Sequence, residues 1–400
     1  MCEKTQGNVI GYWMSEKKRQ KLNWMEFGKV CRKHGYELVK LDLSLPLEDQ
    51  GPFCLILHKL TDIIAQGEKG DVKAQEMIRR VEEYFRGHPE VAVLDPLDNV
   101  RKLLDRSISY SVIHNSSLEK TDVFTPTFVE LVSNDYVENL RKLKQAGISF
   151  PFVCKPSFAH GSSQAHQMCV MFNEAGVRDC RPPCVAQSFI NHNAVLYKIY
   201  IVGEQHYVVE RPSLKNFYPS DHPTISFDAH QVSKPDSKSS LSILDPEDAA
   251  LPTLKPDPDR LTLIASTVRQ ALGMSLLGVD VVVENSTGKL AIIDINAYPG
   301  YDGYPDFFDH LIACITQTLS EHDASAPTVS SYSSQSSSSS SPNKISSLDD
   351  FAKPNRIAHF ASGATCDQDD SGFDTGDSSD EKKKQREQQV ARQRVTVSRK

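Results

Sequence analysis

Two aspartates, Asp280 and Asp294, are the residues of this sequence whose surroundings point most directly to chemistry. Each stands inside an apolar run, LLGVDVVV for the first and LAIIDIN for the second, and the turn formers NSTG at residues 285–288 separate the runs. This pattern predicts a β-hairpin with strands at 279–283 and 290–295. In the simplest register Asp280 lies opposite Asp294, with their Cβ atoms roughly 5 Å apart.

A divalent cation would explain why two carboxylates stand so close together. Side chains alternate along a strand, so Ile292, Asp294 and Asn296 are expected on one face. Two buried carboxylates repel each other, and a cation between them removes the repulsion. Carboxylate and amide oxygens suit Mg²⁺, which prefers one or two carboxylates plus phosphate oxygens. The alternative is a surface hairpin with solvated acids, and the apolar neighbours argue against it.

Several lysines stand where strands end, and they suit an anionic ligand. Lys155 closes the apolar segment 151–156, a position where a lysine favours a phosphate contact. Lys18 belongs to the basic run 17–21, just after the first predicted strand, where a helix N-terminus already attracts anions. Lys59 follows the third predicted strand. Solvated surface positions are the alternative for Lys18 and Lys59.

The periodicity of the chain predicts an α/β protein with an open, mostly parallel N-terminal sheet. The strands expected there are 9–14, 37–41, 53–58 and 91–94, with helices after Ser15, around 72–85 and at 99–110. Later strands are expected at 151–156, 170–172, 184–190, 197–202 and 207–210, with helices at 261–272 and 307–319. The small-residue segment AHGSSQAH at 159–166 suggests a loop over phosphates, and the Pro-, Ser- and Asp-rich segment between 217 and 260 suggests a long loop.

Composition limits the possible functions. The chain has 400 residues and a net charge of −7, so we expect no nucleic-acid partner, and no apolar run is long enough to span a membrane. Nine dispersed cysteines suggest reduced thiols in the cytoplasm, with the nucleus left open; Cys180 and Cys184 lack a matching second pair, which argues against zinc. Residues 323–400 are Ser-rich and charged, which predicts a disordered tail.

Longer motifs narrow the interpretation, because Walker, dinucleotide and protein-kinase signatures are missing from the sequence. The motifs are GYWMSEKK at 11–18, HKLTD at 58–62, LDPL at 94–97, LLDRS at 103–107, FPFVCKP at 150–156, AHGSS at 159–163, INHNAVLYK at 190–198, RPSLKNF at 211–217, VSKP at 232–235, RQALGMSLLGVD at 269–280 and IDINAYPGY at 293–301. Together they resemble the ATP-grasp fold and, more narrowly, the inositol-tetrakisphosphate 1-kinase (inositol 1,3,4-trisphosphate 5/6-kinase) family. The resemblance spans roughly residues 8–320 and leaves the tail uncovered.

The resemblance implies an ATP-grasp fold in which residues 1–115 form the inositol phosphate side and 116–322 bind ATP and Mg²⁺. By position, the family's ATP-binding residues correspond to Arg106, Lys155, Gln187, Ser213 and Ser233, with residues 187–198 around the adenine. The residues implied to face the inositol polyphosphate are Lys18, Lys59, His166, Lys198, Asn296 and Gly300. Asp280, Asp294 and Asn296 would carry two Mg²⁺ ions.

The implied activity is Mg²⁺-assisted transfer of phosphate from ATP to inositol 1,3,4-trisphosphate at the 5/6 positions and to inositol 3,4,5,6-tetrakisphosphate at the 1 position. We expect a monomer. Two alternatives stay open: an ATP-grasp carboxylate–amine ligase, and a non-catalytic inositol phosphate binding protein. The lysines favour a polyanionic acceptor over the ligase, and the retained metal-type residues argue against simple binding.

Overall fold

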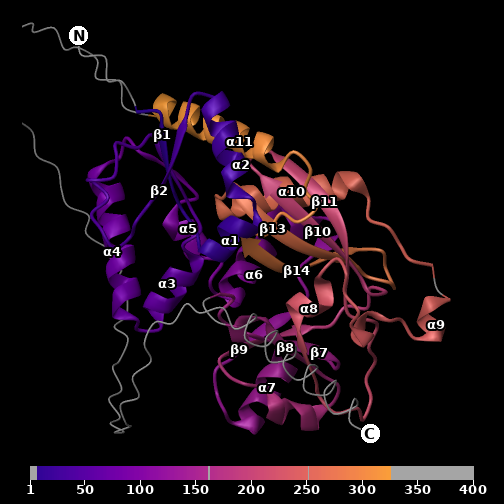
Figure 1. Cartoon of the computed structure of the whole chain (residues 1–400). Helices are drawn as coiled ribbons and strands as arrows, with labels where there is room; N and C mark the ends of the chain where they lie inside the picture. Colours follow the sequence, from indigo (N-terminus) through magenta and orange to yellow (C-terminus); the bar gives the residue numbers. More distant parts are fainter. Residues whose placement is uncertain (1–6, 161–162, 251, 326–400) are drawn as a thin grey trace, which may run out of the picture. The chain divides into compact units, whose positions relative to one another are not determined.

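The computed structural model describes residues 7–160, 163–250 and 252–325, and within these ranges the chain forms three β-sheets flanked by helices (Figure 1). The N-terminal sheet has the order β2-β1-β3-β4, and its strands pair in parallel. Its strands are β1 Val9–Trp13, β2 Glu37–Lys40, β3 Leu55–His58 and β4 Ala92–Leu94. The helices connecting and following them are α1 Glu16–Lys21, α2 Trp24–Lys33, α3 Thr61–Glu68, α4 Val72–Gly87 and α5 Leu97–Arg101. The predicted parallel N-terminal sheet is therefore confirmed.

The remaining strands of the described chain form two five-stranded sheets. All pairings in these sheets are antiparallel except β14 with β5. In the order of the first sheet, the strands are β11 Gln205–Pro212, β10 Val195–Val202, β13 Leu276–Val283, β14 Leu290–Ala297 and β5 Val123–Phe124. In the order of the second, they are β12 Ile225–Asp228, β8 Gln167–Met171, β7 Phe152–Pro156, β9 Cys184–Ser188 and β6 Phe128–Leu131.

The remaining helices are α6 Arg106–His114, α7 Tyr136–Gln145, α8 Ala229–Ser233, α9 Pro246–Ala249, α10 Pro258–Leu272 and α11 Phe307–Ser325, with short 3₁₀ helices η1 Ser117–Lys120, η2 Ser163–His166, η3 Glu174–Asp179 and η4 Ser240–Ser242. The predicted cap of α10 is confirmed, because Gly273 adopts a left-handed φ of 63° that glycine tolerates at a helix end. Helix α11 ends at Ser325, so the predicted disordered tail lies outside the described residues beyond that point.

Two helices predicted as continuous are divided. The helix after Ser15 ends at Lys21, and Asn23, in a left-handed conformation with φ 50°, starts a second helix in a new direction. The helix predicted at 99–110 is also wrong, because the side chain of Asp105 caps a new helix by accepting from the backbone N–H of Ser107 at 2.7 Å. The second break places Arg106 at the first position of α6.

The segment predicted as a long loop between 217 and 260 is partly structured. It contains β12, α8 and α9, so the loop prediction is wrong over those elements. Phe227 of β12 and Val232 of α8 are buried against Phe172 and Met168, in a small core beside the second sheet. This packing gives an otherwise polar segment an apolar anchor that its composition obscured.

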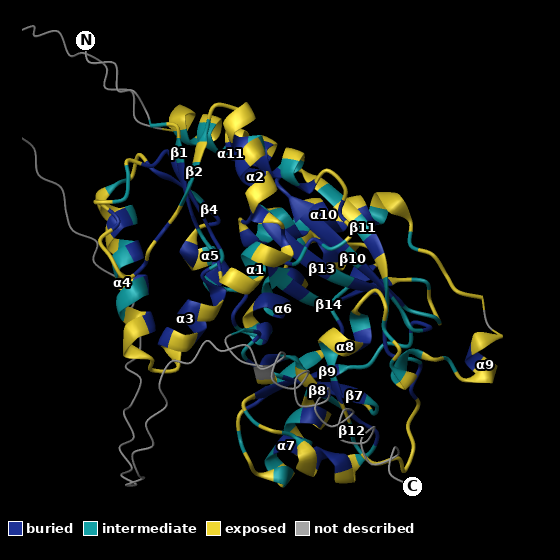
Figure 2. Ribbon diagram, viewed as in Figure 1, coloured by how far each residue is buried: buried dark blue, intermediate teal, exposed yellow. Residues whose placement is uncertain are grey.

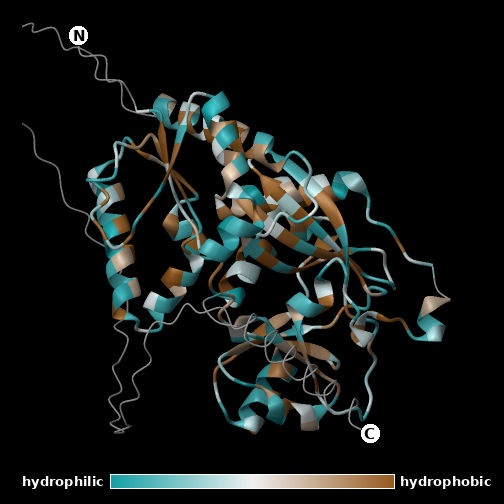
Figure 3. Cartoon of the chain, in the orientation of Figure 1, coloured by the Kyte–Doolittle hydropathy of each residue, from teal (hydrophilic) through white to brown (hydrophobic). Residues whose placement is uncertain are grey.

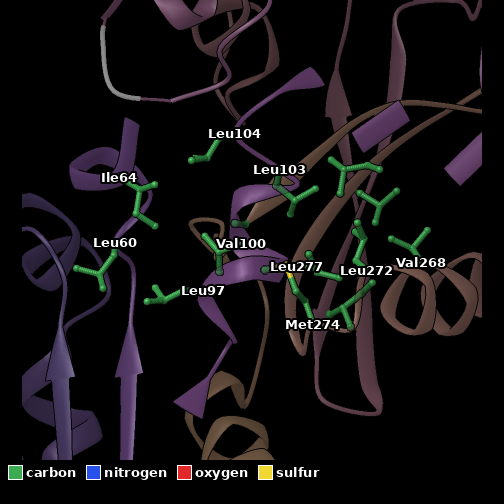
Figure 4. Packing of buried hydrophobic residues seen from close by; sticks show 14 of the residues in the cluster. Leu60, Ile64, Leu97, Val100, Leu103, Leu104, Val268, Leu272, Met274 and Leu277 are labelled. Atoms are coloured by element: carbon green, nitrogen blue, oxygen red, sulfur yellow. The ribbon is translucent and has the colours of Figure 1, made fainter. Parts of the chain in front are cut away.

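One large hydrophobic core joins the N-terminal sheet to the first five-stranded sheet. It includes Leu60 and Val100 from the N-terminal part and Val268 and Leu277 from α10 and β13 (Figure 4). Figure 2 shows the central strands of both sheets as mostly buried, and Figure 3 shows their hydrophobic residues against hydrophilic outer helix faces. The two parts are therefore packed together rather than joined by a free linker.

Helix α11, the last element of the described chain, lies beside α2 in the N-terminal part (Figure 1). Phe308 of α11 packs on Trp24 and Phe27 of α2, with ring centroids 6.1 and 5.3 Å apart. The boundary predicted near residue 115 stays a prediction, but both ends of the described chain contribute to the N-terminal core. None of the helices in the described ranges is long and apolar enough to cross a membrane.

A buried polar joint fastens β4 to β13. The carboxylate of Asp95, immediately after β4, accepts from the backbone N–H groups of Ser275 at 2.7 Å and Leu276 at 3.0 Å. Nε2 of His58, at the end of β3, lies 2.8 Å from the carbonyl oxygen of Asp95 and donates to it. Burial lowers the pKa of His58 to about 4 and raises the pKa of Asp95 to about 6. His58 is therefore neutral at pH 7.

Replacing His58 with glutamine is expected to make the protein less sensitive to acid. Because the pKa of His58 is about 4 in the folded protein and about 6.5 when unfolded, the unfolded chain binds the proton first. The free energy of unfolding should fall by roughly 3 kcal/mol between pH 7 and pH 4 from this group alone. Urea denaturation across this range should show a shallower decline for His58→Gln than for the wild type. The exposed His34→Gln is the control, and parallel declines would contradict the assignment.

Candidate active site

A row of charged side chains crosses three neighbouring strands of the first five-stranded sheet. Lys198 of β10 pairs with Asp280 of β13, and Asp280 pairs with Asp294 of β14, which confirms the predicted hairpin register. Nζ of Lys198 lies 2.8 Å from Oδ1 of Asp280 and donates to Oδ2 at 3.1 Å. Directly paired residues on adjacent strands share a face of the sheet, so the two carboxylates and one ammonium group form a single row.

A β-bulge interrupts the hairpin next to this row. Asp280 pairs with Asp294 but Val281 pairs with Ile292, so Ile293 is the extra residue on β14. Ile292 consequently packs in the main core, and its predicted position on the face of Asp294 is wrong. The bulge also makes the carbonyl oxygen of Ile293 available, and it accepts from Nζ of Lys155 at 2.6 Å.

Asp294 is surrounded by donors and cations from other elements. Nε of Arg106 lies 3.7 Å from its Oδ1, and the hydroxyl oxygen of Tyr110 lies 3.3 Å from the same oxygen and 3.0 Å from the carbonyl oxygen of Ile293, the two acceptors that share its one proton. Tyr110 also accepts from Nζ of Lys155 at 3.1 Å. Burial raises the pKa of Asp294, but the positive charges of Arg106 and Lys155 lower it by more than burial raises it. The pKa therefore lies below its ordinary value, and the carboxylate is ionised. Burial raises the pKa of Asp280 despite the opposing charge of Lys198.

Arg106 is predicted to contact ATP, and the structure gives its guanidinium group additional partners. Its Nη1 donates to the carbonyl oxygen of Pro156 at 2.6 Å, and its Nη2 donates to that of Ala165 at 3.2 Å. These bonds join the end of β7 to Ala165, near the end of the segment 159–166 predicted to cover phosphates, of which residues 161–162 lie outside the described ranges. Arg106 therefore positions this segment as well as facing Asp294.

The chemistry of the two carboxylates is compatible with an Mg²⁺ ion. Oδ1 of Asp280 is buried and lies 2.8 Å from the Lys198 ammonium group. Asn296 stands two residues after Asp294 on β14 and is only partly buried. Two carboxylates and an amide oxygen are hard donors of the kind Mg²⁺ prefers. Asp280, Asp294 and Asn296 therefore fit the ion.

A pocket between the two five-stranded sheets leads to these carboxylates. Lys155, Gln187, Ser213 and Ser233 line it together with Asp280 and Asp294, so the structure brings these predicted residues together. Its apolar lining comes from both sheets and nearby loops, through Val153, Met168, Leu196, Phe227, Val232 and Ile293. An apolar slot with a few polar groups at one end is suited to a flat ring attached to charged groups.

The polar residues that line the pocket differ in whether they have a hydrogen-bond donor left for a ligand. Gln187 is buried, and its Nε2 has no hydrogen-bond partner. Nδ1 of His192 lies 2.5 Å from the carbonyl oxygen of Ile190, so Nδ1 carries the proton and Nε2 accepts from the Ser213 hydroxyl at 2.7 Å. The hydroxyl of Ser233 donates to the carbonyl oxygen of Ala229 at 2.9 Å. Of Gln187, Ser213 and Ser233, Gln187 is therefore the residue whose donor is available to a ligand.

A second group of cations gathers around the turn after β14. The carbonyl oxygen of Tyr298 accepts from Nζ of Lys18 at 3.1 Å and from Nζ of Lys59 at 3.0 Å, and Lys18 also donates to the carbonyl of Pro299. Burial lowers the pKa of both lysines, and the charge of Lys59 lowers that of Lys18 further. Gly300 lies in the same turn, where an added Cβ would stand 3.1 Å from Nζ of Lys21.

His166 is a neutral group that packs against another histidine. It ends η2, and its ring lies against His230 with centroids 3.9 Å apart. Burial lowers the pKa of His166 to about 4, so it offers a hydrogen bond rather than a charge at pH 7. Sequence reasoning missed the structural partners Tyr110 and His230. Tyr110 stands four residues after Arg106, a helical spacing that could have revealed it, whereas His230 gave no sequence signal.

Comparisons with known proteins agree with this architecture. The family model described as the inositol 1,3,4-trisphosphate 5/6-kinase ATP-grasp domain matches residues 117–317, and the corresponding pre-ATP-grasp domain matches residues 9–100. An inositol-tetrakisphosphate 1-kinase of Danio rerio is 46% identical over 317 residues, covering 78% of this chain and 79% of the relative. One from Xenopus laevis is 46% identical over 324 residues, covering 80% and 81%.

A solved structure supports the fold independently of sequence. The crystal structure of D-cycloserine synthetase DcsG aligns with a TM-score of 0.52 at 12% identity, covering 78% of this chain and 99% of that chain. At this identity the likeness concerns the fold alone. The predicted ATP-grasp fold is confirmed by the family match and by this structural similarity.

Lys155→Met should weaken nucleotide binding while changing the fold little. Burial lowers the pKa of Lys155 to about 8, so its charged form is poorly stabilised in the ligand-free protein. A bound phosphate would add counter-charge to that of Asp294, and we expect ATP affinity to fall at least about tenfold, or roughly 1.4 kcal/mol. Calorimetric titration with ATP and thermal melts measure the two effects. The exposed Lys144→Met is the control, and unchanged ATP affinity in Lys155→Met would contradict the assignment.

Proposed function

Because the chain belongs to the inositol 1,3,4-trisphosphate 5/6-kinase family, we propose that it is an ATP-dependent kinase of inositol polyphosphates. The proposed acceptors are inositol 1,3,4-trisphosphate, at the 5/6 positions, and inositol 3,4,5,6-tetrakisphosphate, at the 1 position. The observation that carries the proposal is the charged row Lys198–Asp280–Asp294, which lies between an apolar pocket and the lysines around Tyr298. A cytoplasmic monomer remains part of this proposal.

The pocket accounts for the ATP side of the reaction. The adenine would lie among the apolar residues, where the unpartnered Nε2 of Gln187 can donate to a ring nitrogen. Lys155 would bind the phosphates at the open end, and Arg106 would hold the segment above them through its backbone contacts. Phosphoryl transfer is catalysed mainly by such positioning and by stabilisation of charge.

The carboxylate row accounts for the metal. We assign Mg²⁺ to the oxygens of Asp280, Asp294 and Asn296, and the proposed number of ions is two. When bound, Mg²⁺ neutralises charge on the phosphate oxygens during transfer. Lys198 neutralises Asp280 at a distance of 2.8 Å in the ligand-free protein, so this carboxylate is kept in place before the metal arrives.

The lysines around Tyr298 account for the acceptor. Lys18 and Lys59 are half-buried cations that repel each other and donate to backbone carbonyls, an arrangement that a polyanion would stabilise. Only Ala297 separates Tyr298 from Asn296, so the chain holds the acceptor cations beside the metal residues. An inositol polyphosphate bound here would present a ring hydroxyl to the transferred phosphoryl group.

A product-resolved assay tests the class of reaction. The protein is incubated with γ-labelled ATP, Mg²⁺ and either inositol phosphates or carboxylate–amine pairs, and the products are separated by chromatography. We expect label on the inositol ring. ATP consumption that depends on a carboxylate and an amine would establish a ligase instead. Binding of inositol phosphates without turnover would establish a non-catalytic binding protein.

Asp294→Asn should abolish most turnover without preventing folding. Asparagine keeps the shape of the side chain but removes the charge that faces Arg106 and Lys155, and it offers one oxygen rather than two to a metal. We expect single-turnover phosphoryl transfer at saturating Mg²⁺ and ATP to slow by at least about a thousandfold, or roughly 4 kcal/mol. The melting temperature without Mg²⁺ should fall slightly, because a favourable charge is lost.

A surface aspartate provides the matched control for this substitution. Asp98 forms an ion pair with Arg101 and its side chain is 93% exposed, so Asp98→Asn makes the same chemical change outside the site. Its transfer rate should equal that of the wild type. Near-normal transfer in Asp294→Asn would remove Asp294 from the proposed metal site and leave Asp280 as the main carboxylate.

Lys18→Ala should weaken the acceptor and spare the nucleotide. Loss of a charge-assisted phosphate contact is expected to raise the KM for the inositol phosphate about tenfold, with the KM for ATP nearly unchanged. The control is Lys17→Ala, which removes an exposed lysine from the same helix and leaves the proposed contact of Lys18 in place. Steady-state kinetics with each substrate varied in turn provides the measurement. A rise confined to the KM for ATP would place Lys18 on the nucleotide side.

A further inference from the structure

Three cysteines far apart in the sequence meet on the second five-stranded sheet. The Sγ atoms of Cys154, Cys180 and Cys184 all lie within 4.8 Å of one another. Cys154 lies on β7, Cys184 begins the neighbouring strand β9, and Cys180 follows η3. In sequence only Cys180 and Cys184 are close, and these two thiols alone argued against zinc. The fold adds Cys154 as a third thiol.

The cluster lies on the opposite side of the sheet from the nucleotide pocket. Val153 and Lys155 line the pocket, so the alternation of β7 turns Cys154 to the other face. There Cys154 and Cys184 are buried in the small core that includes Leu143 of α7. A metal bound by these thiols would therefore be separate from Asp280 and Asp294.

The thiols are placed to act as ligands rather than only as small apolar side chains. The seven cysteines within the described ranges are free of disulfides. Because the thiolate is the form that binds metals, all three thiols must lose their protons on binding, and their shared position lets each sulfur reach one ion.

The spacing of the sulfur atoms also agrees with one shared ion. Metal–sulfur bonds of about 2.3 Å place three thiolates around one ion roughly 4 Å apart. Sulfur atoms already within 4.8 Å can reach that spacing by small rotations of their side chains. Cys180 is only partly buried, so an ion has access from the solvent side. Thiolate ligands select soft ions over Mg²⁺ or Ca²⁺.

We propose that Cys154, Cys180 and Cys184 form a three-thiolate site for a soft metal ion of the Zn²⁺ class. Each thiol loses its proton to solvent on binding, and the metal–sulfur bonds replace the hydrogen bonds among the three groups. The site ties β7, β9 and the segment after η3 together. Lys155 is the residue after Cys154, so metal binding stabilises the strand that carries a proposed phosphate ligand.

Metal titration of the reduced full-length protein tests the proposal. Cd²⁺ is the spectroscopic probe, because a cadmium–thiolate charge-transfer band appears only when sulfur is a ligand. We expect the band to saturate at one equivalent and Zn²⁺ to compete for the same site, while excess Mg²⁺ has no effect. Cys180→Ser should weaken Cd²⁺ binding at least tenfold, because it removes one of three ligands. Asp280→Asn should keep the band unchanged.

Cys169→Ser is the matched control on the same sheet. Cys169 pairs with Cys154 across β7 and β8, but its sulfur contacts the Ser226 hydroxyl at 3.3 Å and lies outside the cluster. This variant should bind Cd²⁺ like the wild type. Lack of a band in the wild type, or an undiminished band in Cys180→Ser, would overturn the proposal.

A measurement on the wild type covers the case in which Cys180→Ser fails to fold. The reduced protein is alkylated with and without one equivalent of Zn²⁺, and the modified cysteines are identified by mass spectrometry. We expect Zn²⁺ to protect Cys180 most clearly, since it is the most accessible of the three ligands, and to leave Cys169 reactive. Equal alkylation of Cys180 with and without Zn²⁺ would overturn the proposal.

Discussion

The burial of two carboxylates side by side on adjacent strands is the constraint on which this structure depends. Asp280 and Asp294 are directly paired, and neither could stay ionised there without nearby cations. Lys198 lies beside one, and Arg106 and Lys155 lower the pKa of the other. These cations come from three separate elements, β10, α6 and β7, so the charge balance itself requires both five-stranded sheets and α6 to assemble correctly. The bulge at Ile293 supplies the carbonyl that anchors Lys155.

The acceptor side depends on a different set of contacts. Lys18 lies on α1 and Lys59 follows β3, both in the N-terminal part of the chain, whereas the carbonyl of Tyr298 to which both donate follows β14. Packing between the N-terminal part and the first five-stranded sheet therefore determines where the two lysines lie relative to the carboxylates. The shared core seen in Figure 4, the Asp95 carboxylate and the return of α11 to α2 provide that packing. In the proposed kinase, this packing determines the distance between the acceptor and the nucleotide.

Strand β7 illustrates how one short segment serves two environments. Lys155 faces the nucleotide pocket, and Cys154 faces the core beside α7. Alternation along the strand makes this division unavoidable, because adjacent residues point to opposite sides. A soft ion on one face would stiffen the strand that positions a phosphate ligand on the other. The two metal types would not compete, because hard oxygen donors and thiolates select different ions.

The sequence determined what local pattern can carry: the hairpin with its opposed aspartates, the parallel N-terminal sheet and the family motifs that name the site residues. Periodicity and turn chemistry act over a few residues, so they suffice for these features. Only the tertiary structure decided the rest. The cap at Asp105 outweighed the helical pattern of 99–110 and turned Arg106 inward, and the bulge moved Ile292 to the other face. Packing alone brought α11 back to the first sheet and Cys154 to Cys180, because contacts between distant residues leave no periodic signal.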